Sequence, residues 1–558
     1  MASFVTFKAM LGRHKHGAFM LATIALVLLL GLSAYYKQAS IPDAEISVRS
    51  KKPAEFYDSV STNKDLSNRI KTLVKSLEYP DKVAEDFTRM VMDWKDEKNR
   101  SILLRWKVEL SNAHKEYQER KITRNQVVKI EESILREFFE IIRMQFSDNN
   151  FSFELSDIIE NRQVNCLSFS QLMYITCNAV GLLVRPIDVL DPLISSEDGT
   201  RQCHMACIVD LFDGRLVMAD VLLLFEIPSR AFKLEDHFLK VGHYWELKDK
   251  DNPLKIHKRI RLLDGKGLLA SIYNSRGAVY LSGEYDRAIL EYNKAIENDP
   301  GNALAYFNRG VTYYDKDEYD RAILDYTKAI EIDLRFPEAY YNRGIIYANK
   351  GEYDQAIQDY TKAIEINPKY TSAYINRGGI YEDKGEYDHA IQDYTKIIEI
   401  NPKITGAYYN RGLTYVNKDE FDRAILDFTK AIEINPKYAD AYYNRGLTYV
   451  NKDEFDQAIL DFTKAIEINP KYADSYNNRG RAYYERDEYV RAILDFKKAI
   501  EIDPNYALAY LNRAEVYAEL GKSKEAKKDL LKALKLDPEL REHVKEISEQ
   551  YELDLKLD

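Results

Sequence analysis

The tripeptide Asn-Arg-Gly recurs through the second half of the chain at a fixed interval of 34 residues, with its glycines at Gly310, Gly344, Gly378, Gly412, Gly446 and Gly480. Ser275-Arg276-Gly277 precedes this series, at an interval one residue shorter than 34. Asn512-Arg513-Ala514 ends the series. A unit of this length cannot bury an apolar face alone, so its copies must stack on one another. This period therefore restricts the second half of the chain to a repeat architecture.

Each unit is predicted to form two helices, because apolar residues recur at helical spacing on both sides of a short turn. Proline cannot continue a helix, and one ends the second helix of most units. Leu334 replaces this proline in the second unit, so we expect that helix to end less sharply. We predict eight units over residues 268–540 and a charged capping helix over 541–558. The prolines are Pro300, Pro368, Pro402, Pro436, Pro470, Pro504 and Pro538.

The repeats resemble the tetratricopeptide repeat family, whose period is 34 residues. The resemblance covers about half of the chain and implies an all-α superhelix, a solenoid that binds a protein or a peptide. Within one unit, the residues that match the family pattern are Gly344, Tyr347, Gly351, Tyr353, Ala356, Tyr360, Ala363 and Pro368.

In this family the first helix of each repeat lines a concave groove, so the resemblance places a ladder of asparagines there. An asparagine side chain offers both a donor and an acceptor, and the ladder could hold the backbone of an extended peptide. Tyr341, Tyr409 and Tyr443 stand beside it and would supply aromatic contact area. The alternative is that the asparagines cap or pack within the array. They are Asn308, Asn342, Asn376, Asn410, Asn444, Asn478 and Asn512.

The residue before each repeat glycine, commonly leucine in the family, is arginine here, and an aspartate follows 16 residues later. We hypothesise that each arginine pairs with the carboxylate of its own repeat. Partly exposed ion pairs contribute about 0–1 kcal/mol, so such pairs would fix register more than stability. The alternative is two independently solvated faces. The pairs run from Arg309 with Asp325 to Arg513 with Asp529, and Arg276 with Glu291 takes their place in the first repeat.

Residues 18–36 carry no charge and read AFMLATIALVLLLGLSAYY. A helix of about 19 residues is roughly 28 Å long, enough to cross the hydrocarbon core of a membrane. Basic residues precede the segment, so residues 1–17 are predicted to be cytoplasmic. The rest of a single-pass protein would then lie outside the cytoplasm, in the periplasm or the extracellular space. Residues 37–62 are polar and are predicted to be a linker.

A cleaved signal peptide is the alternative for residues 18–36. It would need small residues at the cleavage site, and Leu32 interrupts the frame that ends at Ala34. We therefore predict a retained transmembrane signal anchor, which makes the membrane a partner of this chain.

Residues 63–265 are predicted to form an α+β domain that begins with helices. Helical periodicity extends over 63–145, and an apolar helix from Cys166 to Val180 ends at Gly181. The strand-like segments LLVRPIDVL, HMACIVDLF and RLVMADVLLLF follow, and Asp213-Gly214 between the last two indicates a hairpin.

Three residues of this region could act together. Cys166 starts a helix, where the backbone dipole favours a thiolate, and His204 begins the first strand of the hairpin. With a three-residue loop, Asp220 is the diagonal neighbour of His204 on the same face of the hairpin. A two-residue loop would put the two side chains on opposite faces.

The segment NCLSFSQLMYITCNAVGLLVRPIDV, with the His204 and Asp220 strands, resembles the transglutaminase-like superfamily of papain-type Cys-His-Asp proteins. The resemblance covers about residues 150–225 and implies that Cys166 is the nucleophile, His204 its base and Asp220 the group that orients the imidazole. The implied reaction is cleavage or transfer at amide bonds. Met205 and Val221 depart from the family pattern, so the alternative is a non-catalytic scaffold with a pseudo-enzyme domain.

Charge and cysteine usage limit the other function classes. The net charge of −10 argues against a nucleic-acid partner. Four cysteines are too few for a disulfide scaffold. Cys203 and His204 would point to opposite faces of a strand, so no metal site is predicted, and no motif for a cofactor occurs. The sequence leaves the oligomeric state open.

Overall fold

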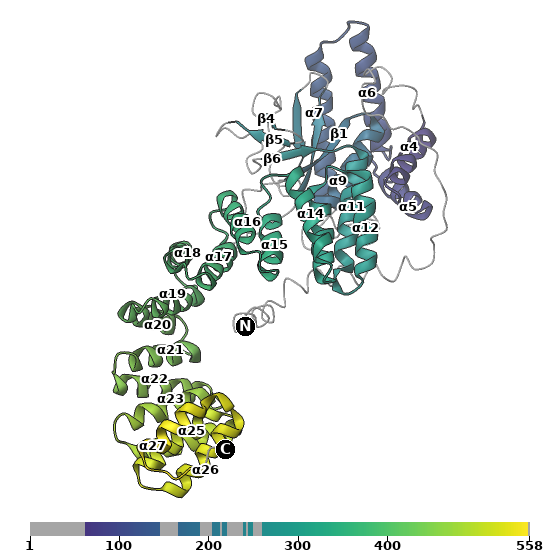
Figure 1. The fold of residues 1–558 in the computed structure, drawn as a ribbon. Helices are drawn as coiled ribbons and strands as arrows, with labels where there is room; N and C mark the ends of the chain where they lie inside the picture. Colours follow the sequence, from purple (N-terminus) through teal and green to yellow (C-terminus); the bar gives the residue numbers. More distant parts are fainter. Residues whose placement is uncertain are drawn as a thin grey trace. The chain divides into compact units, whose positions relative to one another are not determined.

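The computed structural model describes residues 62–145, 166–189, 204–211, 215–219, 238–241, 244–248 and 259–555 (Figure 1). The chain divides into two compact units, Met1–Ile346 and Tyr347–Asp558, and each is described by itself. The predicted segments 1–17 and 18–36, and nearly all of the linker 37–62, lie outside the described residues.

The first unit begins with helices, as the periodicity over 63–145 predicts. Two of them have capped starts, because the Thr62 and Ser101 hydroxyls accept hydrogen bonds from the backbone amides of Asp65 and Leu104. Their apolar faces meet in one core. The helices are α4 (Asn63–Ser76), α5 (Asp81–Met92), α6 (Ile102–Gln118), α7 (Arg124–Gln145) and α9 (Cys166–Val180), and the core contains Trp106, Phe138 and Phe169.

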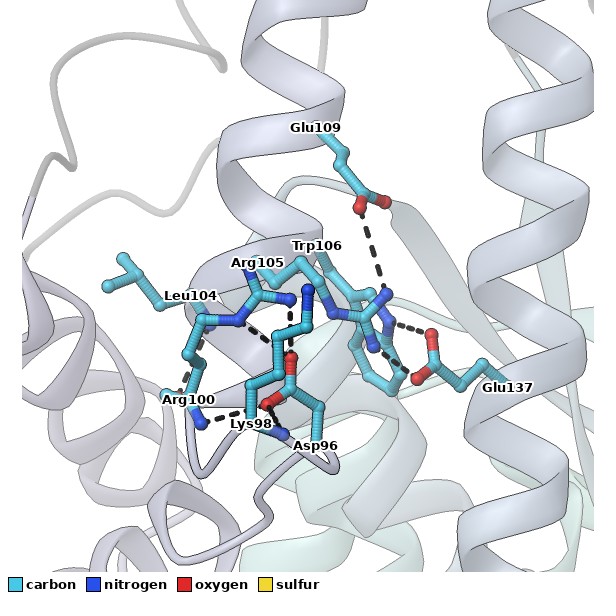
Figure 2. A network of polar contacts seen from close by, with 9 residues as sticks. Asp96, Lys98, Arg100, Leu104, Arg105, Trp106, Glu109 and Glu137 are labelled. Carbon is cyan, nitrogen blue, oxygen red and sulfur yellow. Dashed lines mark hydrogen bonds and ion pairs between the residues drawn. The ribbon is translucent and has the colours of Figure 1, made fainter.

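A polar network joins α6 to α7 and to the loop before α6 (Figure 2). Glu137 of α7 accepts from the indole Nε1 of Trp106 at 2.7 Å and from the guanidinium of Arg105. In the loop, the Asp96 carboxylate accepts from the backbone amides of Lys98 and Arg100, each at 2.9 Å. The backbone and side-chain hydrogen bonds from Arg100 lower the pKa of Asp96 to about 2. The network therefore orients α6 and α7 relative to each other.

The strands of this unit form one antiparallel sheet in the order β3-β2-β1-β6-β5-β4, and α9 packs against β1 and β2 (Figure 1). Cys207 lies opposite Ala219 and Asp210 opposite Leu216 in the β2–β3 hairpin, which gives the three-residue loop 212–214. The strands are β1 (Leu183–Val189), β2 (His204–Asp210), β3 (Leu216–Ala219), β4 (Phe238–Val241), β5 (Tyr244–Leu247) and β6 (Arg259–Leu262).

The predicted fold class is confirmed for the helical array and wrong for the rest. Within the part of the chain that the structure describes, no helix is long and apolar enough to cross a membrane. The sheet is small, with strands of four to seven residues, and gives no clear transglutaminase-like α+β domain. Apolar runs mislead here because they report burial, and neither strand length nor strand pairing follows from them. The predicted location of the chain depends on residues 18–36 and stays a prediction.

The array consists of helix pairs from Gly265 onward, and α27 (Arg541–Gln550) follows the last pair. In chain order the first and second helices of the repeats are α11 (Gly265–Val279) and α12 (Tyr285–Asn298), α13 (Ala303–Asp315) and α14 (Tyr319–Ile332), α15 (Pro337–Asn349) and α16 (Tyr353–Ile366), α17 (Thr371–Asp383) and α18 (Tyr387–Ile400), α19 (Thr405–Asn417) and α20 (Phe421–Ile434), α21 (Ala439–Val450) and α22 (Phe455–Ile468), α23 (Ala473–Tyr484) and α24 (Tyr489–Ile502), and α25 (Ala507–Glu519) and α26 (Ser523–Leu536).

The repeat glycine is explained by an aromatic ring of the second helix. A Cβ atom at Gly412 would lie 2.8 Å from the Phe428 ring, and one at Gly446 would lie 2.8 Å from the Phe462 ring. The expected weak end of the second repeat is not found, because α14 ends at Ile332 as α16 ends at Ile366, without the proline.

Two ion pairs, one buried and one partly buried, join the sheet to the first repeats within the first unit. Arg259 of β6 donates to Asp333 after α14 at 2.6 Å, and Arg261 of the same strand donates to Asp299 after α12 at 2.6 Å. The Arg259 and Asp333 side chains are 4% and 1% exposed. Since an unpaired charge at such a position is costly, these pairs fix the strand against the ends of both helices.

Candidate peptide-binding surface

The hypothesised arginine–aspartate pairs exist in the array and are bidentate. The Arg411 Nε and Nη2 atoms donate to the two carboxylate oxygens of Asp427 at 2.7 and 2.8 Å. Burial raises the pKa of the Asp461 carboxyl, and the hydrogen bond from Arg445 opposes this rise. The same geometry, with distances of 2.6–3.0 Å, joins Arg309 to Asp325, Arg377 to Asp393, Arg445 to Asp461, Arg479 to Asp495 and Arg513 to Asp529.

Most of the repeat arginines also reach the preceding repeat, which the hypothesis did not include. Arg411 Nη1 donates to the Thr395 hydroxyl at 2.9 Å, so one guanidinium connects three helices of two repeats. In the first repeat, Glu291 pairs with Lys294 at 2.9 Å, and its pairing with Arg276 stays a prediction. The other threonines that accept in this way are Thr327, Thr361, Thr429 and Thr463.

The predicted groove asparagines are half-buried on the first helices, and four of them donate to the preceding repeat. Asn444 Nδ2 donates to the Tyr409 hydroxyl at 3.0 Å and Asn478 Nδ2 to the Tyr443 hydroxyl at 2.9 Å. Asn512 and Asn308 donate in the same manner to Asn477 at 2.9 Å and to Asn274 at 3.0 Å. These four amides thus also pack within the array, and their role in binding stays a prediction.

The predicted groove tyrosines are held by neighbouring rings. The ring centroid of Tyr409 lies 5.0 Å from that of Tyr438, and that of Tyr443 lies 4.9 Å from that of Tyr472. Burial raises the pKa of Tyr443 to about 12, so its hydroxyl stays protonated at neutral pH. Tyr341 is buried. In the same part of the array, Tyr472 donates to the Asp440 carboxylate at 3.0 Å.

The remaining predicted groove residues differ in their surroundings. Asn342 on α15 hydrogen-bonds to Tyr326 on α14, the second helix of the preceding repeat. Asn376 lies half-buried on α17. Asn410 lies half-buried on α19, and no hydrogen bond of its side chain is found within the described residues. The asparagine ladder is therefore not uniform along the array.

The predicted triad is only partly within the described residues. Cys166 is the first residue of α9 and His204 the first of β2, while Asp220 and the side chains of both others lie outside that part. The register of the β2–β3 hairpin is the one that the triad requires. The catalytic role of these three residues stays a prediction. Cys177 and Cys207 are buried free thiols.

Models of known families match the array and support its assignment. A model described as tetratricopeptide repeat matches residues 337–370, 371–404, 406–438, 439–472 and 507–540. A model described as TPR repeat matches 278–317, 312–351 and 480–521, and a further tetratricopeptide repeat model matches 462–493. Residues 278–540 are an array of tetratricopeptide repeats. These family models match the array, and they do not show the transglutaminase-like resemblance of the middle region.

Solved tetratricopeptide repeat structures resemble parts of this chain. MamA is 34% identical, over 29% of this chain and 94% of MamA, with a TM-score of 0.28. YrrB, a TPR protein with an unusual peptide-binding site, is 29% identical over 33% of this chain and 95% of its own, with a TM-score of 0.31. The C-terminal part of a TPR repeat-containing protein from Cytophaga hutchinsonii is 23% identical over 42% and 98%, with a TM-score of 0.39. A comparison with curated proteins finds no match.

Proposed function

We propose that this protein is a scaffold whose tetratricopeptide array binds a protein or peptide partner on the first-helix face. The observation that carries the proposal is the set of half-buried tyrosines and asparagines on α19, α21 and α23, held in place by contacts between repeats. Groups that are already ordered lose little conformational freedom when a partner binds. Tyrosine rings and side-chain amides suit an extended peptide, because they contact both its side chains and its backbone.

A library of random dodecapeptides displayed on phage tests this proposal with the full chain as bait. We expect enriched peptides that bind the double variant Tyr409→Ala/Tyr443→Ala at least tenfold more weakly than the original protein. The matched control is Leu426→Ala/Leu460→Ala, which truncates two leucines of the second helices that are 70% and 60% exposed. The absence of any enriched peptide, or equal binding to both double variants, would contradict the proposal. Circular dichroism checks that each variant folds.

A second proposal is thiol chemistry at Cys166, and the hairpin register supports it. In the described residues Cys207 pairs with Ala219, a register that agrees with the predicted diagonal placement of His204 and Asp220. A thiol at a helix start is favoured as the thiolate. We expect iodoacetamide to label Cys166, and His204→Ala to suppress that labelling. The buried Cys177 serves as the internal control, because burial raises the pKa of its thiol. If His204→Ala does not change the labelling of Cys166, the thiol proposal fails and only the scaffold role remains.

A further inference from the structure

The inter-repeat asparagine bonds follow one rule at four positions, and Asn410 departs from it. At four positions the amide donates to the residue that occupies the place before the asparagine in the preceding repeat, namely a tyrosine or an asparagine. For Asn410 that residue is Ile375, which has no acceptor. No partner for the Asn410 amide is found in the part of the chain that the structure describes, and the side chain is half-buried. Its donor and acceptor are therefore available to a ligand.

The surface beside Asn410 also lacks a side chain. Gly379 follows Ile375 by one helical turn on α17, and the next two repeats carry Leu413 and Leu447 at this position. A Cβ atom built at Gly379 would meet no atom within 4 Å. Ile375 itself is 36% exposed. We call Ile375, Gly379 and Asn410 the repeat-4 face, which joins an exposed apolar side chain, open space and a free amide.

The charge around the repeat-4 face is negative. Glu382 of α17 accepts from the Tyr394 hydroxyl at 3.1 Å and from the Thr414 hydroxyl, which are both neutral. Asp383 is exposed, and no ion pair of its carboxylate is found among the described residues. The adjacent Lys384 is engaged by Asp354 at 2.9 Å and by Glu386 at 3.2 Å. A cationic group on a partner would therefore find two carboxylates here without a cation of their own.

We propose that the repeat-4 face anchors the partner: a basic, extended peptide segment. The Asn410 amide pairs with a backbone amide group of the segment, and an apolar side chain lies over Gly379 against Ile375. A neighbouring lysine or arginine of the segment faces Glu382 and Asp383. This inference rests on the proposed function. It adds the position on the array at which the partner binds and the chemical character of the partner.

The test uses the full chain and the dodecapeptides that the phage library enriches. Ile375→Tyr introduces the hydroxyl that Tyr409 and Tyr443 provide in the next two repeats. This hydroxyl should accept a hydrogen bond from the Asn410 side-chain amide and so compete with the peptide. Gly379→Leu restores the side chain of Leu413 and Leu447, and the open space lets it fold. We expect each change to weaken binding at least tenfold. Leu426→Tyr on α20 is the matched control, since it makes the same kind of change at an exposed second-helix position, and binding should stay within twofold.

The possible results separate the inference from the proposed function. An enriched consensus that joins an apolar residue to lysine or arginine, with both weakening effects, supports the inference. Enriched peptides that bind Ile375→Tyr and Gly379→Leu as tightly as the original protein overturn the inference and leave the proposed function standing, and so does an acidic consensus. A library that yields no peptide overturns the proposed function and the inference with it.

Discussion

At the residue scale, the spacing of 16 residues predicts the arginine–aspartate pair but not its third partner. Arg445 binds Asp461 of its own repeat and Thr429 of the preceding one, and both lie 16 residues away in opposite directions. A spacing in one sequence cannot show which neighbours stack, so the contact between repeats was not predictable. The hydrogen bonds of the groove asparagines were unpredictable for the same reason, because their acceptors lie in the preceding repeat.

The third contact of the arginine should be measurable. Thr429→Val removes the acceptor of Arg445 Nη1 with little change in shape, and we expect the free energy of unfolding to fall by about 1 kcal/mol. At Arg513 a hydroxyl acceptor can be added instead of removed. Lys497 stands where most other repeats carry the threonine, and no bond from Arg513 to the preceding repeat is found in the described residues. Lys497→Thr should stabilise by a similar amount. Urea unfolding followed by circular dichroism measures both, and a stabilising Thr429→Val would contradict the role of the contact.

At the scale of elements, the period and the prolines predict the helices of the array well, because each repeat supplies its own apolar pattern and stop. The sheet is predicted in part. The segments LLVRPIDVL and HMACIVDLF correspond to β1 and β2, while β4 to β6 were not predicted. Strands as short as Arg259–Leu262 show too few residues for a period of two to stand out, and the sheet order depends on contacts distant in sequence.

Two glycines of neighbouring first helices should respond in opposite ways to the same substitution. Gly412→Ala pushes a methyl group against the Phe428 ring, since the added Cβ would lie 2.8 Å from it, and overpacking should destabilise by about 1–3 kcal/mol. Gly379→Ala meets no atom within 4 Å and should stabilise by about 0.5–1 kcal/mol, because alanine favours the helix. Urea unfolding compares the two variants, and equal signs would show that the ring contact does not select the repeat glycine.

At the scale of the whole molecule, the sheet and the first repeats of the first unit belong together through buried charges. The sequence does not predict which aspartate pairs with Arg259. Asp503 follows α24 at the same position at which Asp333 follows α14, and only the folded chain brings Arg259 to Asp333. The residue type is therefore no signal by itself. The apolar pattern places both helices in the array but cannot show which of them faces the strand β6.

Asp333→Asn tests how strongly this contact holds the first unit together. The change leaves the buried Arg259 charge with Glu246 as its remaining carboxylate partner, at 3.2 Å, and loss of a hydrogen bond to a charged group costs about 1.5–3 kcal/mol. Asp503→Asn is the matched control at an exposed position, where we expect a change within about 0.5 kcal/mol. Hydrogen exchange read by mass spectrometry should show faster exchange in β6 and α14 for Asp333→Asn only. Equal exchange in the two variants would mean that the Arg259–Asp333 pair adds no coupling between the strand and the repeats.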